Sequence, residues 1–250
     1  MAVREERCVW EGECNLMKAV LLRVGIDKGT DGALGPIFDD GTFVYVPPSE
    51  WDPASFERRT FRSTIGTTGY PLATYLPTRL ADRIIHDDPE FVTYTYGDAS
   101  AKQSYLLKLS RGDILTFYAG LQPFRTQRQV AGLYIIGHFT VARVVDFNQL
   151  SDKQRAACLD RYPRNAHLKR NEPAENLVIV AGDRTRSGLL QKALLISEGR
   201  RMRNGRIGQA VSRDCEQVLG VRGFIDRSMP PRLIEDAPYV SALLDLLRVG

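Results

Sequence analysis

The sequence predicts an α+β fold, in which a small, strongly bent β-barrel or mixed sheet is flanked by helices. Runs rich in apolar and β-branched residues recur between glycine- and proline-containing turns, which is the pattern of short strands. Other segments have the apolar spacing of amphipathic helices. The chain has 250 residues, of which 43% are hydrophobic and 26% charged, enough for one generous core. We therefore expect residues 17–250 to form a single α+β domain.

The strands are predicted in order along the chain from these runs. Residues 18–26 and 42–47 are apolar and β-branched, and prolines between positions 47 and 89 prevent long helices after them, leaving a short helix near residues 77–85. Further strand patterns follow at residues 90–98 and 175–183. Between them, one strand is predicted just before the insertion at residues 121–129, and a long one runs from that insertion to residue 147. A short helix or strand opens the run that begins at residue 105.

Helices are predicted at residues 149–163, 187–197 and 237–250. In the first of these, Ser151 is a plausible N-cap and Pro163 stops the helix. Cys158 falls on an apolar position of this helix, which favours a core residue over a nucleophile. The other two segments are amphipathic at helical spacing.

Composition excludes several classes of protein. No apolar run reaches the roughly 20 residues of a membrane helix, and the polar, acidic residues 1–16 do not form a secretory signal. We expect those residues to be a disordered extension, with Met17 as a natural start. The four cysteines lack the spacing of a zinc site or a disulfide scaffold, so we expect a cytoplasmic protein with no metal. No cofactor site is evident in the sequence, so we also expect no cofactor.

Positive charge is concentrated late in the chain. The net charge is +4, and residues 151–250 contain 18 Lys/Arg against 12 Asp/Glu. Arginine predominates, notably at Arg200, Arg201 and Arg203, and its planar fork pairs well with phosphate. This pattern is typical of a surface that binds a polyanion such as DNA, although a solvated charged face has the same composition.

A glycine-rich loop after the first strand is the first candidate site. Gly29, Gly32 and Gly35 allow a close approach of backbone to a flat ligand, so we expect them to bind substrate. Asp27 and Lys28 lie at the strand exit and are candidate general acid and base groups. The spacing fits neither a P-loop nor a dinucleotide motif. The alternative is a surface loop whose glycines satisfy turns.

Aromatic residues mark a second candidate site. Tyr94 and Tyr96 alternate along a predicted strand that ends at Asp98, so both rings could stack on one base while Asp98 serves as a third acid/base group. Tyr118 and His138 lie in other apolar strands and are candidate substrate contacts. All four of these rings could equally be core residues with satisfied polar atoms.

Two polar loops are candidate phosphate-binding sites. His167, Lys169 and Arg170 follow the first long helix. Arg184 and Ser187 precede the predicted helix at 187–197, whose N-terminal amides would favour an anion. An ordinary capping loop would have the same composition.

Three stretches together resemble a known family. They are "MKAVLLRVGIDKGTDGALGPIFDDGTFVYVP", "FVTYTYGD" and "LSRGDILTFYAGL…LYIIGHFTV", and the likeness extends from Met17 to about Ser197. They resemble the nucleotide modification associated domain proteins of the third type. The third stretch is also similar to the barrels of pseudouridine synthase and archaeosine transglycosylase (PUA-like) proteins.

The resemblance implies a role in hypermodification of DNA bases, because the family occurs in bacterial and phage neighbourhoods that make such bases. It implies DNA carrying a modified base as the partner, together with other enzymes of the same pathway. An enzyme that adds water to a base substituent, such as a 7-deazaguanine nitrile, is one expectation. A non-catalytic reader of modified bases, or a scaffold of a modification complex, is the alternative.

Overall fold

A mixed β-sheet forms the centre of the molecule, which is described by a computed structural model for residues 16–225 and 230–250. The expected disordered extension at residues 1–16 lies outside this range except for Leu16. The antiparallel pair β4 (Ile114–Pro123) and β5 (Gly132–Asp146) is the middle of the sheet. β1 (Ala19–Val24) runs parallel to the first part of β4, and β2 (Gly35–Ile37) continues along the same edge.

The other edge of β5 is shared by two strands. β7 (Gly188–Arg201) pairs with its first half and β6 (Val178–Gly182) with its second half. β3 (Thr95–Asp98) extends the sheet beyond β6, β8 (Ile207–Val211) pairs with β7, and β9 (Arg232–Ile234) pairs with β1. The order β3–β6–β5–β4–β1–β9 is open at both ends. The mixed-sheet prediction is confirmed, but a closed barrel is not found among the described residues, because β5 divides its edge between two branches.

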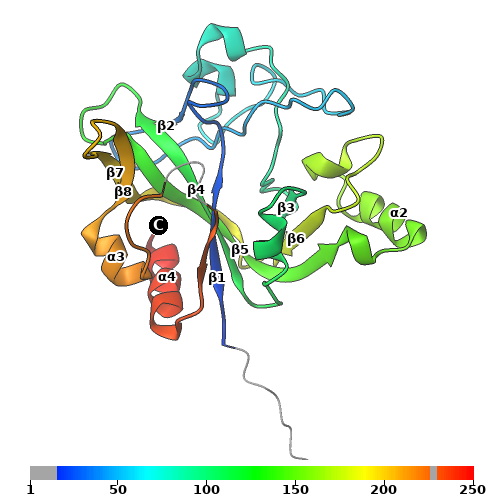
Figure 1. Cartoon of the computed structure of the whole chain (residues 1–250). Helices are drawn as coiled ribbons and strands as arrows, with labels where there is room; N and C mark the ends of the chain where they lie inside the picture. The colour runs from blue at the N-terminus through cyan, green and yellow to red at the C-terminus, as the bar shows by residue number, and fades with distance from the viewer. Residues whose placement is uncertain (1–15, 226–229) are drawn as a thin grey trace, which may run out of the picture.

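Helices flank this sheet, as expected (Figure 1). They are α1 (Gln103–Leu106), α2 (Asp152–Arg161), α3 (Arg213–Leu219) and α4 (Ala237–Val249), with short 3₁₀ turns at Leu72–Tyr75, Thr78–Leu80, Phe147–Gln149 and Ala166–Leu168. The predictions of α2 and α4 are confirmed, and Ser151 caps α2 in a capping box with Gln154. In the described part of the chain, no helix is long and apolar enough to cross a membrane.

The helix predicted at residues 187–197 is wrong. This segment is β7, which pairs with β5 from Gly132–Glu198 to His138–Gly188 through two register shifts. Those shifts accommodate the irregular apolar spacing that had suggested a helix. Pairing with an otherwise open strand edge outweighs the local preference.

Two predicted strands are shorter than expected. Residues 42–47 are extended but form only one bridge, between Phe43 and Ile37. The strand expected at 90–98 begins at Thr95, because Tyr94 has φ of 61°, in the left-handed region. The predicted alternation of Tyr94 and Tyr96 on one strand face is therefore wrong.

Three apolar clusters hold these elements. The largest joins β1, β4, β5, α3 and α4, and at its centre the rings of Phe117 and Phe139 lie 4.7 Å apart. A second cluster joins the long segment between β2 and β3, with Phe61 and Ile85, to Ile26 and Ala33 of the loop after β1. A third packs α2 against β6 through Tyr162. The segment between β2 and β3 is thus packed against the loop after β1, which holds its side chains in place.

We expect Phe117→Ala to destabilise the fold by about 3–5 kcal/mol, because the ring is fully buried against Phe91, Tyr96 and Phe139. Denaturant unfolding followed by circular dichroism measures the change. Ile207→Ala is the control, since 72% of that side chain is exposed, and it should change stability by no more than about 0.5 kcal/mol. Equal effects of the two changes would contradict this account of the core.

Candidate functional site

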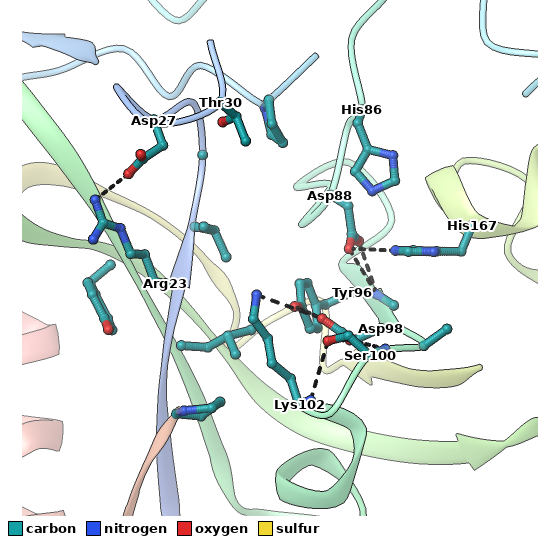
Figure 2. A pocket seen from close by; sticks show the side chains of 18 of the residues that line it. Arg23, Asp27, Thr30, His86, Asp88, Tyr96, Asp98, Ser100, Lys102 and His167 are labelled. Atoms are coloured by element: carbon teal, nitrogen blue, oxygen red, sulfur yellow. Dashed lines mark hydrogen bonds and ion pairs between the residues drawn. The ribbon is translucent and has the colours of Figure 1, made fainter. Parts of the chain in front are cut away.

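A cavity of about 640 Å³ opens between the end of β1 and the end of β3 (Figure 2). Its walls come from the loop after β1, the segment from β3 to α1, the loop at residues 86–88, and the 3₁₀ turn at Ala166–Leu168. Segments far apart in the sequence therefore supply one space, whose lining combines apolar surface with charged and polar side chains. Its volume lies within the range of small-molecule sites.

One wall of the cavity is formed by the end of β1. Gly25 turns the chain there with φ of +79°, a conformation that favours glycine. A Cβ atom added at this position would also lie only 3.2 Å from the Val46 carbonyl oxygen. Arg23 and Asp27 form an ion pair, and Asp27 also accepts a hydrogen bond of 2.7 Å from the Gly29 amide. A glycine of the predicted loop thus holds Asp27 in position.

The opposite wall is a hydrogen-bonded group at the end of β3. Asp98 accepts a hydrogen bond of 2.9 Å from the Tyr96 hydroxyl and bonds from the amide and hydroxyl of Ser100. The ammonium of Lys102 lies 3.8 Å from the same carboxylate. These donors surround Asp98, and its carboxylate links Tyr96 and Lys102 at this wall of the cavity.

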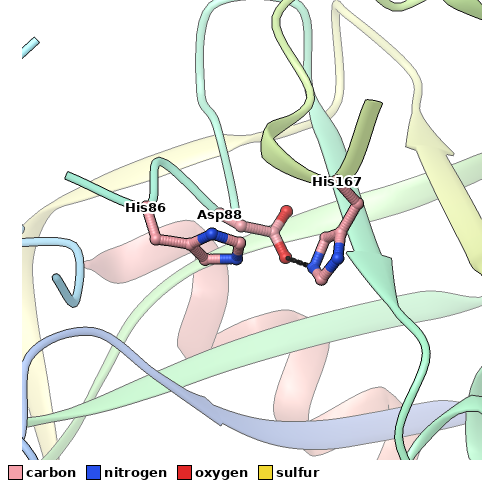
Figure 3. A group of neighbouring side chains, drawn as sticks. All are labelled: His86, Asp88 and His167. Atoms are coloured by element: carbon pink, nitrogen blue, oxygen red, sulfur yellow. Dashed lines mark ion pairs between the residues drawn. The ribbon is translucent and has the colours of Figure 1, made fainter. Parts of the chain in front are cut away.

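Between these walls, Asp88 lies beside two histidines (Figure 3). Its carboxylate accepts the Gly97 amide at 3.0 Å, and its Oδ2 is 3.4 Å from Nε2 of His167. The rings of His86 and His167 meet edge to face with centroids 4.9 Å apart. Nδ1 of His86 is 2.8 Å from a carboxylate oxygen of Glu50.

Burial sets the protonation of this group. Burial raises the pKa of Asp88 well above its usual value, although the charge of His86 and the Gly97 amide oppose the change. Burial, with the positive charge of Arg170, lowers the pKa of His167 to about 4. Burial also disfavours ionised Glu50, but the hydrogen bond and charge of His86 outweigh it and lower the pKa of Glu50 to about 2. At neutral pH, His167 is therefore a neutral ring.

Ion pairs attach the segment after β2 to the turn that contains His167. Lys169 and Arg59 hold the buried carboxylate of Glu57, with Lys169 Nζ at 2.7 Å. The Phe56 amide donates to the Lys169 carbonyl at 2.7 Å, and Arg170 lies 3.5 Å from Glu50. These contacts join the two chain segments from which His86 and His167 come.

Three ligand atoms in this cavity are suited to a metal ion. One each from His86, Asp88 and His167 lie within 4.8 Å of one another. Two imidazoles and a carboxylate are a donor set used by catalytic zinc and by non-haem iron. The cysteine spacing that predicted no metal does not bear on this set, since none of the three residues is a cysteine.

The model of the family described as nucleotide modification associated domain 3 matches residues 18–219, which is most of the chain. The chain belongs to this family. The family resemblance expected from the sequence is thereby confirmed, and it indicates a role in nucleotide or DNA modification. No curated protein and no solved structure matches the chain.

Only some of the predicted site residues of this nucleotide modification associated domain meet in the cavity. Its lining includes Asp27, Asp98, Tyr96, Tyr118, His167 and Arg170. Lys28, Gly29 and Gly32 are exposed outside it, whereas Gly35 is buried in β2 against Leu121. Tyr94 packs its ring edge-on against Phe139, and Lys169 is paired with Glu57.

The remaining predicted residues lie elsewhere. His138 and Ser187 line a second cavity of about 680 Å³ beside α4, and Arg184 is exposed in the turn between β6 and β7. Because β7 is a strand, the helix amides expected near Ser187 are not present. Arg200, Arg201 and Arg203 are exposed at the β7–β8 hairpin, across the sheet from β3 and β6 (Figure 1).

Sequence reasoning missed His86, Asp88, Glu50 and Arg23. A signal for the first two is present, because His86 and Asp88 flank one residue in the stretch "IIHDDPE", where an extended chain directs alternate side chains to the same side. The signal is short, and nothing in the sequence indicates that His167 faces them.

We expect Gly97→Ala to disturb the cavity, because the added carbon would lie 2.8 Å from the His167 ring and 3.1 Å from Oδ1 of Asn165. The strain should lower the free energy of unfolding by about 1–3 kcal/mol. Gly188→Ala is the matched control, since that position has open space around it and should tolerate the methyl group. Equal stability of both variants would show that His167 does not pack on Gly97.

We expect Glu57→Gln to destabilise the fold at pH 7 by about 1.5–3 kcal/mol, because Arg59 and Lys169 lose the buried anionic carboxylate that accepts their hydrogen bonds. Burial opposes ionisation of Glu57, but hydrogen bonds from Arg59 and Lys169 lower its pKa below the usual 4.5. The carboxylate therefore stabilises the fold above that pH, and the stabilisation is lost as the pH falls below it.

Urea unfolding of both proteins at several pH values between neutral and acidic measures this difference. The gap between wild type and variant should narrow toward acid. A gap that stays constant with pH would mean that the Glu57 carboxylate does not link these segments through its charge.

Proposed function

We propose that this protein is a DNA base-modifying enzyme that binds a modified nucleobase in the cavity and adds water to a substituent of that base. The observation that carries the proposal is that His86, Asp88 and His167 meet Asp98 and Lys102 around one cavity. The membership in a nucleotide modification family supplies the substrate class. A base in DNA reaches such a cavity only when it leaves the helix stack.

The walls supply complementary contacts for a polar, flat ligand. Arg23 donates hydrogen bonds to base carbonyl groups, and Asp27 accepts them from base N–H groups. Tyr118 lies on the cavity floor, 1% exposed, with its pKa raised to about 12 by burial, so it stays a neutral hydroxyl. Arg170 lines the cavity as well, where it favours a neighbouring phosphate.

The chemistry follows from the neutral and charged groups that face each other. A water molecule held by His167 and Asp88 attacks an electron-poor carbon, of which the nitrile of a 7-deazaguanine is an example. The water oxygen bonds to the nitrile carbon, one proton passes to the nitrile nitrogen, and tautomerisation gives an amide. No other reactant is needed. Lys102, held by Asp98, is positioned to stabilise the nitrogen as charge develops.

Binding of the surrounding DNA is assigned to the arginine side chains outside the cavity. Arg200, Arg201 and Arg203 are exposed at the β7–β8 hairpin, and Arg184 is exposed between β6 and β7. Exposed guanidinium groups contact phosphates without reading sequence. Specificity for the modified base therefore comes from the cavity.

The test is conversion of nitrile-bearing DNA, followed by mass spectrometry of the digested nucleosides. Wild type should increase the base mass by one water molecule. His167→Ala and Asp98→Asn should each reduce the rate at least about 100-fold. The first removes an acid/base group, and the second removes the carboxylate that orients Lys102. Asp160→Asn, on the exposed face of α2, removes a carboxylate away from the cavity and should leave the rate unchanged.

Two outcomes would contradict the proposal that this protein is a base-modifying enzyme. Conversion that persists in both cavity variants would place the chemistry elsewhere. Tight binding that selects modified over unmodified duplexes, without any mass change, would instead favour a reader of modified bases.

A further inference from the structure

We infer that His86, Asp88 and His167 form a binding site for one divalent transition-metal ion, with a face open to the cavity. The inference concerns binding by these three side chains. The role of the ion in water addition, by contrast, rests on the proposed function.

The donor atoms are of the right kind and at the right spacing. Ligand atoms in a tetrahedral site with bonds of about 2.1 Å lie about 3.4 Å from one another. Asp88 Oδ2 and His167 Nε2 are 3.4 Å apart, which is longer than a good hydrogen bond between them. The third ligand atom, from His86, lies within 4.8 Å of the others, so all three donors border one region of the cavity.

The contacts behind the ligands orient them toward one point. Glu50 accepts from Nδ1 of His86, which leaves Nε2 with the lone pair that a metal requires. Glu50 is in turn fixed by the amides of Trp51 and Asp52, each at 2.9 Å. A carboxylate behind a histidine ligand is a recurrent feature of zinc sites.

Asp88 and His167 are fixed in the same way. The Gly97 amide holds the Asp88 carboxylate, and the backbone of Gly97 packs against the His167 ring. Nδ1 of His167 is buried and makes no hydrogen bond with the described residues. The ligands are therefore held by the fold before any ion arrives, which lowers the cost of ordering them.

A structural network of buried polar groups is the competing explanation. Such a network requires close hydrogen bonds between its members, because buried polar groups are costly when unpaired. The Asp88–His167 spacing does not supply one. All three side chains also line the cavity, so an ion bound there would keep a position open for water. A metal in that position generates a nucleophile from water at neutral pH.

The direct test is titration of the metal-free full chain with Zn²⁺, with Fe²⁺ under anaerobic conditions, and with Mg²⁺, followed by calorimetry. We expect one equivalent of Zn²⁺ or Fe²⁺ to bind through these residues, and Mg²⁺ to bind poorly because imidazole is not its preferred ligand. His86→Ala and His167→Ala should each weaken binding at least about 100-fold, and Glu50→Gln about 10- to 100-fold.

The chain offers a matched control, because it has three histidines. His138→Ala, in the second cavity, should leave the affinity unchanged. Circular dichroism checks that each variant folds, and His86→Gln replaces His86→Ala if the latter does not. Absorption of the Co²⁺-loaded protein reports the ligands directly, and we expect nitrogen and oxygen ligands without the strong near-ultraviolet band of a thiolate.

Absence of binding, binding abolished by His138→Ala, or a cysteine thiolate band would each overturn the inference. These measurements use no nucleic acid, so their outcome is separate from that of the base-modification test. A chain that binds the ion but leaves DNA unchanged would contradict the proposed function and leave the metal site in place. A chain that converts DNA without binding any ion would overturn the metal site and leave the proposed function in place.

Discussion

A fully buried carboxyl group at Asp88 is the constraint on which the arrangement of the cavity depends. A carboxylate removed from water is costly unless other groups compensate it. Here the Gly97 amide and two histidines surround it, and each comes from a different part of the chain. The edge of β3, the loop at residues 86–88 and the turn at Ala166–Leu168 must therefore all be in place together.

The β-sheet positions the strand ends around the cavity. β5 shares one edge between β6 and β7, and the β6 branch carries β3, whose end supplies Gly97 and Asp98. On the other side of β5, β4 separates it from β1, and β1 contributes Arg23 near its own end. The segment between β2 and β3 borders the space between these strand ends. It shares an apolar cluster with Ile26 and Ala33 of the loop after β1, and Glu57 joins it to Lys169.

The electrostatics of the cavity divide it into two regions. Around Asp98 the carboxylate is held by Lys102 and by hydroxyl donors, which suits positioning and recognition. Around Asp88 the neighbours are imidazoles, which suit water activation or metal binding. A base substituent placed between the two regions would meet a source of water on one side and Lys102 on the other.

The sequence was sufficient to predict β1, β6, α2, α4 and the family, because apolar period, capping residues and a long contiguous motif are local signals. It also indicated Asp27, Tyr96, Asp98 and His167, each of which lines the cavity. The strand at residues 188–201 and the position of His167 opposite His86 and Asp88 became clear from the three-dimensional arrangement. Those outcomes depend on which strand edge remains open and on contacts between distant segments, and neither has a periodic signal in the chain.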